Sequence, residues 1–591
     1  MPTLALINFN IVCATLGGFI SLFGLVSYLC KEQFYLSEAL ISLIAGVIFS
    51  PHAANFIRPE DYALHSQQNL EAITLHFTRL VLGVQLVLAG VQLPKRYLQL
   101  EWRSLGLLLG PGMAVMWISS SLLVWAMVPN FKFLHALIVG ACVTPTDPVL
   151  SNSIVKGKFA DKHVPRPLQR IIIAESGAND GLGYPFLFFG VYLLQYTGMG
   201  AQAYSGGAGK AMALWFYETW AYTILLSVAY GTVVGWIARK LLHWAEEKHY
   251  VDRESFLVFA IALALFVVGT CGLIGTDDLL ACFIAGNVFT QDDWFRLETM
   301  DDSLQPTIDM LLNLSVFMWF GAVCPWSSFL KNDIIPIYRL IFLGILILLV
   351  RRLPIVFAMH KWIPQIELVS QAAFVGFFGP IGVGAIFYLS VSLEFLREIK
   401  VDGEIPEDVT QVIETIQIVV WFLVICSIVV HGLSVPLGKA GYHLPRTISS
   451  VISTTHEDHE PIPITNIRHT HSTATPLTVG EDSSYRSRKR GFRFRSATPR
   501  PPFFRIGGSV IPDRLPSNQP GVVGRAVGVA LCLVLFDFPS QLIYYSWVVF
   551  VVSMAGVDRQ LAGLNGLVYV GPSGGVGSIA QILRLIAYEE Y

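Results

Sequence analysis

The sequence predicts an all-α polytopic membrane protein of about thirteen transmembrane helices, followed by a polar tail. Hydrophobic residues make up 53% of the 591 residues and charged residues only 14%, and the mean hydropathy is +0.57. Soluble domains are far less apolar. Apolar runs of about 20 residues, the length that crosses a bilayer core, recur as far as residue 437.

Polar punctuation divides the apolar part into the expected helices. Their ranges are 8–30, 36–56, 72–94, 103–128, 132–155, 167–196, 216–243, 254–273, 277–290, 305–325, 333–360, 366–393 and 411–437. The run at 277–290, about 14 residues long, is the least suited to crossing alone. The first run is too long for a signal-peptide core, so we expect it to be retained as a helix.

Lysine and arginine set the expected topology, because they collect in cytoplasmic loops. They cluster in the loops at 95–103 and 156–170. Both loops are therefore expected inside, those at 197–213 and 394–410 outside, and the segment after 440 inside. The acidic loop at 291–305 is an exception, because it falls inside.

Three regions follow from composition. Residues 1–440 form the transmembrane domain, and residues 441–522 form a polar, basic tail that we expect to be disordered in the cytoplasm. Its stretch "RSRKRGFRFRSATPRPPFFR" suits anionic inner-leaflet lipid or a regulatory protein, and nucleic acid is not favoured. Residues 523–591 are apolar and Gly-rich again, as an added membrane or interfacial segment or an altered gene end would be.

The stretch "VTPTDPVLSNS" at 143–153 interrupts the fifth helix. Pro145 and Pro148 are expected to unwind it and to free carbonyls around Thr144 and Thr146. Asp147 lies about 14 Å from the cytoplasmic end of that helix, near the bilayer midplane. A charge there costs about 3 kcal/mol or more, so it is seldom placed without a use. Carbonyl, hydroxyl and carboxylate oxygens together suit a small monovalent cation.

The sixth helix brings a second set of polar groups to the same depth. Asp180 lies about 15 Å along it, and Glu175 with Asn179, like Ser176 with Asp180, share a face. We therefore expect Asp180 to titrate and to take part in ion binding.

Two arginines in the eleventh helix also reach this depth. Arg351 and Arg352 lie about 14 Å from its inner end. A membrane arginine needs a carboxylate partner, and we expect Glu175 to pair with one of the two. This pair is more readily explained as a lock on the fold than as part of transport.

A second interruption, "FFGPIGVGAIF", contains Gly379, Pro380 and Gly382 in the twelfth helix. Paired broken helices in the two halves of a chain point to a transporter with inverted repeats, here helices 1–6 and 8–13. Asp277 and Asp278 precede the ninth helix and either cap it or line an ion entry path.

The stretches "ACVTPTDPVLSNSIVKGKFADKHVP", "AESGANDGLGYPFLF" and "FFGPIGVGAIFY" resemble those of the fungal plasma-membrane sodium/proton antiporters, in the monovalent cation:proton antiporter superfamily. The resemblance covers about residues 1–450. It implies two crossed broken helices, a core and a dimerisation subdomain, and a homodimer. By motif it assigns Asp147 to the unwound helix and Asn179–Asp180 to ion binding.

The same resemblance implies that Glu175 and one of the arginines form the family's intramembrane ion pair, and that Asp277 and Asp278 match its acidic pair. Asn179 implies electroneutral exchange. The implied function is exchange of cytosolic Na⁺, with K⁺ and Li⁺, for external H⁺ at the plasma membrane, for salt tolerance and pH homeostasis. No cofactor is expected beyond the transported ions.

Rival functions are a K⁺/H⁺ exchanger of an internal membrane, a proton-coupled solute symporter and a channel. A channel would need a continuous polar pore and repeated filter elements, which the sequence does not display. No nucleophile–base pair or metal cluster stands out, so an enzyme is not favoured.

Overall fold

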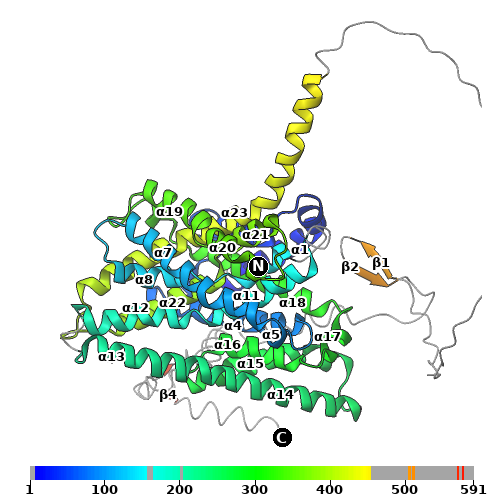
Figure 1. Cartoon of the computed structure of the whole chain (residues 1–591), viewed down its shortest axis with the longest axis horizontal. Helices are drawn as coiled ribbons and strands as arrows, with labels where there is room; N and C mark the ends of the chain where they lie inside the picture. Colours follow the sequence, from blue (N-terminus) through cyan, green and yellow to red (C-terminus); the bar gives the residue numbers. More distant parts are fainter. Residues whose placement is uncertain are drawn as a thin grey trace, which may run out of the picture. The chain divides into compact units, whose positions relative to one another are not determined.

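The structure, a computed structural model, describes residues 7–155, 164–199 and 204–453 and four short strands beyond them (Figure 1). The chain divides into two compact units, residues 1–435 with 520–591, and residues 436–519. All functional residues predicted from the sequence belong to the first unit. The lysines of the 156–170 loop and most of the tail lie outside the described residues.

In the first half of the chain the regular elements among the described residues are all helices. Its elements are α1 (Asn8–Tyr28), η1 (Leu29–Gln33), α2 (Glu38–Phe49), α3 (Pro59–Tyr62), α4 (Gln67–Gln92), α5 (Tyr97–Leu100), α6 (Trp102–Leu107), η2 (Leu108–Gly112), α7 (Met113–Met127), α8 (Phe133–Cys142), α9 (Pro148–Val155), α11 (Arg166–Gly181) and α12 (Tyr184–Thr197).

From Gly207 to Ser453 the regular elements are also helices. Its helices are α13 (Gly207–Leu214), η4 (Trp215–Leu225), α14 (Leu226–Glu247), α15 (Arg253–Ile274), α16 (Asp278–Phe289), α17 (Trp294–Thr299), α18 (Leu304–Val323), η5 (Trp326–Phe329), α19 (Ile337–Val350), α20 (Leu353–Met359), η6 (His360–Trp362), α21 (Val369–Phe377), α22 (Val383–Glu398) and α23 (Glu407–Ser453).

Two antiparallel hairpins follow. They pair β1 (Phe503–Ile506) with β2 (Ser509–Pro512), and β3 (Tyr569–Val570) with β4 (Val576–Gly577). The first pair lies where the sequence predicts a disordered tail. α23 also continues to Ser453, beyond its expected end at 437, because backbone hydrogen bonds sustain a helix past the end of its apolar stretch.

A polytopic all-α membrane fold is confirmed, and each of the thirteen expected ranges contains helix. Among the described residues, eight segments are each long and apolar enough to cross a membrane, and Glu38–Phe49, Phe133–Cys142 and Asp278–Phe289 are shorter apolar helices. The number of crossings therefore stays a prediction.

Two helices predicted as continuous are in fact interrupted. The 167–196 range breaks at residues 182–183 between α11 and α12, and the 333–360 range breaks at Arg351–Arg352 between α19 and α20. Proline follows each break, as Pro185 and Pro354, and removes a backbone donor from the turn. The expected breaks at 143–147 and 378–382 are confirmed.

The short helix α16 is buried because it packs against both α4 and α14 (Figure 1). Glycines allow the close approach: a Cβ on Gly90 would lie 2.6 Å from the carbonyl oxygen of Phe283, and one on Gly235 would lie 2.5 Å from that of Ala285. Small residues at such crossings let the backbones of membrane helices touch. A 12-residue helix is therefore held inside the protein.

Candidate functional site

Asp147 joins the two interrupted helices. Its backbone N–H donates to the carbonyl of Pro380 in the second break, at 2.9 Å. Its carboxylate accepts from the N–H of Leu150 in α9 at 2.8 Å, and from the N–H of Gly384 in α22 at 3.2 Å. The first turns of two helices thus face one buried carboxylate, and the positive ends of both helix dipoles favour its negative charge.

Asp180 approaches the same turn of α22 from α11. Its side chain is fully buried, and both carboxylate oxygens lack a hydrogen-bond partner among the described residues. A Cβ on Gly384 would lie 2.4 Å from Asp180 Oδ1, so the glycine makes room for this carboxylate. A buried carboxylate without partners is costly and is a natural place for a proton or a cation.

Oxygen and amide groups from α11 border the two aspartates. The amide nitrogen of Asn179 donates to Thr146 Oγ1 at 2.8 Å, and Thr146 Oγ1 lies 3.2 Å from Ser176 Oγ. The side-chain amide oxygen of Asn179, Oδ1, is buried without a partner among the described residues. It is a hard ligand beside Asp180 that the polar network leaves unused.

Arg352, and not Arg351, pairs with Glu175. Its guanidinium meets the carboxylate at 2.5 and 2.7 Å, and the two side chains are only 3% and 2% exposed. A further bond from Arg352 Nε reaches the carbonyl of Val375 at 2.9 Å. This fork-on-fork geometry satisfies both charges.

Arg351 holds the two breaks together through their backbone. It donates to the carbonyls of Val143, Thr144 and Pro145 in the first break and of Gly379 in the second. The expectation that unwinding leaves these carbonyls free for a cation is therefore not met in this region. A buried guanidinium has five donors and no carboxylate of its own here, so it takes those acceptors. The Thr144 hydroxyl likewise turns to its own helix, donating to Gly140 at 2.7 Å.

Asp277 and Asp278 make different contacts, and only the capping role is seen directly. Asp277 caps α16: its Oδ1 accepts from the N–H of Leu280 at 3.1 Å, while its Oδ2 is buried without a partner among the described residues. Asp278 instead pairs with Arg79 of α4 at 2.5 Å. Leu280 packs on Gly181, which brings the start of α16 beside the end of α11.

Sequence reasoning did not single out Arg79 or Tyr388. The Tyr388 hydroxyl donates to the backbone carbonyl of Asp180 and so fixes the end of α11. Arg79 could have been noticed as a charge inside the apolar run 72–94. Within the described part of the chain, no three His, Cys, Asp or Glu residues are grouped as metal ligands.

A family model described as "Sodium/hydrogen exchanger, transmembrane" matches residues 18–437. The chain belongs to this family. It is 37% identical over 444 residues to Na(+)/H(+) antiporter 2 of Zygosaccharomyces rouxii, a match covering 74% of this chain and 53% of the relative. A Na(+)/H(+) antiporter of Schizosaccharomyces pombe is 33% identical over 424 residues, covering 71% of this chain and 88% of that one.

The chain spans about half the length of the first of these relatives, and 45% of a Saccharomyces cerevisiae Na(+)/H(+) antiporter that it matches at 37% identity over 76% of its own length. Among solved structures, the sodium proton antiporter MjNhaP1 from Methanocaldococcus jannaschii is similar with a TM-score of 0.51 and 17% identity. That match covers 72% of this chain and 100% of MjNhaP1, and it shows a common fold.

Proposed function

We propose that the protein is a secondary antiporter that exchanges cytosolic Na⁺ for external H⁺. The observation that carries the proposal is the Asp180 carboxylate, buried beside the crossing of two broken helices with no partner among the described residues. The family and the names of the fungal relatives agree with it.

Competition at Asp180 explains the coupling. Burial disfavours a bare carboxylate, so either a proton or a sodium ion must neutralise it. The free carbonyl oxygen of Asn179 and the carboxylate of Asp147 supply further oxygens for the ion. Because one site cannot hold both cargoes, the neutral loaded forms cross between faces and the empty charged form does not. Exchange is then obligatory, one ion for one proton.

The surrounding residues take supporting roles in this proposal. Thr146 and Ser176 orient the Asn179 amide, and Glu175 with Arg352 ties α11 to the α19–α20 break. Arg351 holds the two breaks at Pro145–Pro148 and Gly379–Gly382 in register. Asp277 offers its unpartnered oxygen as an ion entry position, whereas Asp278 is a structural partner of Arg79.

The finer assignments extend the same proposal. K⁺ and Li⁺ are carried as well as Na⁺, because the oxygen ligands suit any small alkali cation. The protein works as a homodimer in the plasma membrane, with movement of a core subdomain against a dimerisation subdomain alternating access. Its basic tail faces the cytoplasm and anionic lipid, and the physiological role is salt tolerance and pH homeostasis.

Purified protein in liposomes with a trapped pH-sensitive dye tests the function. Protons should cross the liposome membrane when Na⁺ is added and should not cross without it. Clamping the membrane potential should not alter the rate. Asp180→Asn should abolish this flux while the protein still folds. Glu298→Gln, which neutralises an exposed carboxylate on α17, is the matched control and should keep wild-type flux.

Two results would overturn the proposal. One is proton flux by the wild-type protein at the same speed with and without salt. The other is sodium-coupled flux by Asp180→Asn at the rate of the Glu298→Gln control.

A further inference from the structure

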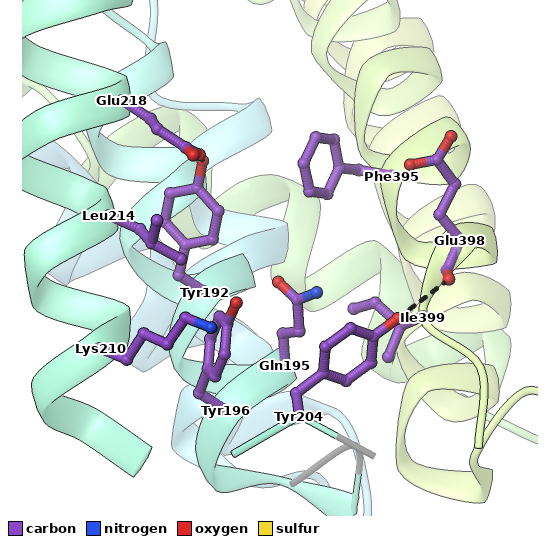
Figure 2. Close-up of a pocket in the computed structure, with 10 residues that line it drawn as sticks. All are labelled: Tyr192, Gln195, Tyr196, Tyr204, Lys210, Leu214, Glu218, Phe395, Glu398 and Ile399. Atoms are coloured by element: carbon purple, nitrogen blue, oxygen red, sulfur yellow. Dashed lines mark hydrogen bonds between the residues drawn. The ribbon is translucent and has the colours of Figure 1, made fainter. Parts of the chain in front are cut away.

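A cavity of about 420 Å³ opens between α12, the α13–η4 helix and α22 (Figure 2). None of its lining residues belongs to the cation site described above. Its lining combines aromatic rings with charged and amide side chains, a mixture that the proposed ion exchange does not require. The cavity therefore calls for an occupant of its own.

Aromatic rings from two sides enclose the cavity. The ring centroids of Tyr192 and Phe395 lie 6.3 Å apart in an edge-to-face arrangement. Those of Tyr196 and Tyr204 lie 5.9 Å apart in the same arrangement. The electron-rich faces of such rings attract organic cations. The rings therefore favour an organic ammonium as the occupant.

Two carboxylates flank the cavity from opposite helices. Glu218 of η4 accepts a hydrogen bond from the Tyr192 hydroxyl at 2.7 Å through one oxygen. The carboxylate of Glu398 of α22 has no ion pair or hydrogen bond within the described part of the chain, and its backbone carbonyl accepts from the Tyr204 hydroxyl at 3.4 Å. Figure 2 shows the Gln195 amide pointing into the space between these two glutamates.

A single basic residue completes the lining. The Lys210 ammonium lies 5.1 Å from the centroid of the Tyr196 ring, and its side chain is exposed. Lys210 therefore marks the rim of the cavity as a place for an anionic group attached to the bound ammonium.

Neighbouring aromatic side chains place the cavity at the edge of the membrane. Phe216, Tyr217, Trp220 and Tyr222 of η4 are all exposed, by 62%, 72%, 37% and 43%. Such belts sit where the bilayer meets water. A ligand can therefore arrive from lipid headgroups or from solution.

We propose that this cavity binds an ammonium group between Glu218 and Glu398, against the rings of Tyr192 and Phe395. The ammonium belongs either to an ethanolamine phospholipid, whose phosphate then meets Lys210, or to a free organic amine. The proposal concerns binding and stands apart from ion exchange, so its failure leaves the transport assignment unaffected.

Binding isotherms on the purified full-length protein in a non-ionic detergent test this. The probes are water-soluble dihexanoyl-phosphatidylethanolamine, 2-phenylethylammonium and, as the amine-free comparison, dihexanoyl-phosphatidylglycerol. Glu398→Gln should weaken amine binding about tenfold or more, the size of a lost charge-assisted contact. Glu394→Gln removes an exposed charge one turn away on the same helix, outside the lining, and should bind like the wild type.

Lys210→Met separates the two sources of the amine. Weaker binding of the phospholipid alone identifies the lipid headgroup, whereas saturable binding of 2-phenylethylammonium without the phospholipid identifies a free amine. The proposal fails if neither amine binds saturably, if phosphatidylglycerol binds as well as phosphatidylethanolamine, or if Glu394→Gln weakens binding as much as Glu398→Gln. Because Glu398 is exposed, a melting curve is sufficient to verify that its variant folds.

Discussion

Glu175 and Asp180 lie little more than one turn apart on α11 and are equally buried, but their surroundings are opposite. Glu175 is held by both arms of Arg352, whereas neither oxygen of Asp180 has a partner among the described residues. The difference comes from the facing helix: the α19–α20 break presents a guanidinium to Glu175, and α22 presents Gly384 to Asp180. Burial alone therefore does not distinguish an acid that stabilises the fold from one that exchanges ions. The distinction comes from whether hydrogen-bond donors face the carboxylate.

The largest expected effect follows from breaking the satisfied pair. Glu175→Gln leaves the Arg352 guanidinium buried without its counter-charge, so the free energy of unfolding should fall by about 3–5 kcal/mol. Thermal unfolding in detergent measures the loss. The double variant Glu175→Leu with Arg352→Met removes both charges and should recover most of the stability. An unchanged melting temperature for Glu175→Gln would remove the contrast with Asp180.

The opposite result is expected at Asp180. Asp180→Asn keeps the volume of the side chain, breaks no hydrogen bond of the carboxylate and removes an unpaired buried charge. Stability should be unchanged or higher by about 1 kcal/mol, while sodium-coupled flux disappears. Melting curves and liposome flux on the same preparation measure both. If stability falls as far as in Glu175→Gln, Asp180 is a structural acid as well.

Two neighbouring acids at the start of α16 differ in the same way. Asp278 forms an ion pair, whereas only one carboxylate oxygen of Asp277 has a hydrogen-bond partner among the described residues. Asp278→Asn strips Arg79 of its partner and should cost about 2 kcal/mol, and the double-mutant cycle with Arg79→Met should give a coupling of similar size. Asp277→Asn retains an oxygen that can cap Leu280, so the melting temperature should not fall. Because it removes the charge proposed for ion entry, sodium-coupled flux should be slower. Equal effects of the two variants on stability would contradict this division.

A more exposed pair should matter less. Arg397 of α22 meets Glu71 of α4, with side chains 24% and 15% exposed, and Gln417 adds a bond to the same carboxylate at 2.9 Å. Arg397→Gln should cost about 1 kcal/mol or less, because solvent screens the pair. The cost should shrink further in about 1 M salt, where the screening length falls to about 3 Å. A loss as large as that of Glu175→Gln would show that exposure does not rank these pairs.

The smallest effect is expected in the segment between α16 and α18, and it depends on pH. Two hydrogen bonds from Arg296, both 2.6 Å long, hold the pKa of Asp293 below its ordinary value. A lowered folded pKa stabilises the protein above the unfolded pKa of about 3.9, and the effect is lost as pH falls through the folded pKa. Asp293→Asn should therefore lower the melting temperature slightly at pH 7, and by less at pH 2.5. An equal difference at both values would exclude the ion pair as its cause.

Much of the fold follows from local chemistry. Pro145 and Pro148 locate the first break, and Gly379 with Pro380 the second, because proline removes donors wherever it occurs in a helix. Composition alone predicts a polytopic membrane protein. The breaks at residues 182–183 and at Arg351–Arg352 are harder to predict. Pro185 and Pro354 follow them, but a single proline in the first turn of a helix does not by itself show that the preceding helix has ended.

By itself the sequence determined the membrane class, the helix breaks at 143–147 and 378–382, and most of the buried acids and arginines, since these depend on composition and on local backbone rules. Only the tertiary structure decided which acid is satisfied. Arg352 reaches Glu175 across 177 residues of chain, and Arg79 reaches Asp278 across 199. Such pairings depend on which helices pack together, and the residue pattern of a single helix does not specify which helix will pack against it.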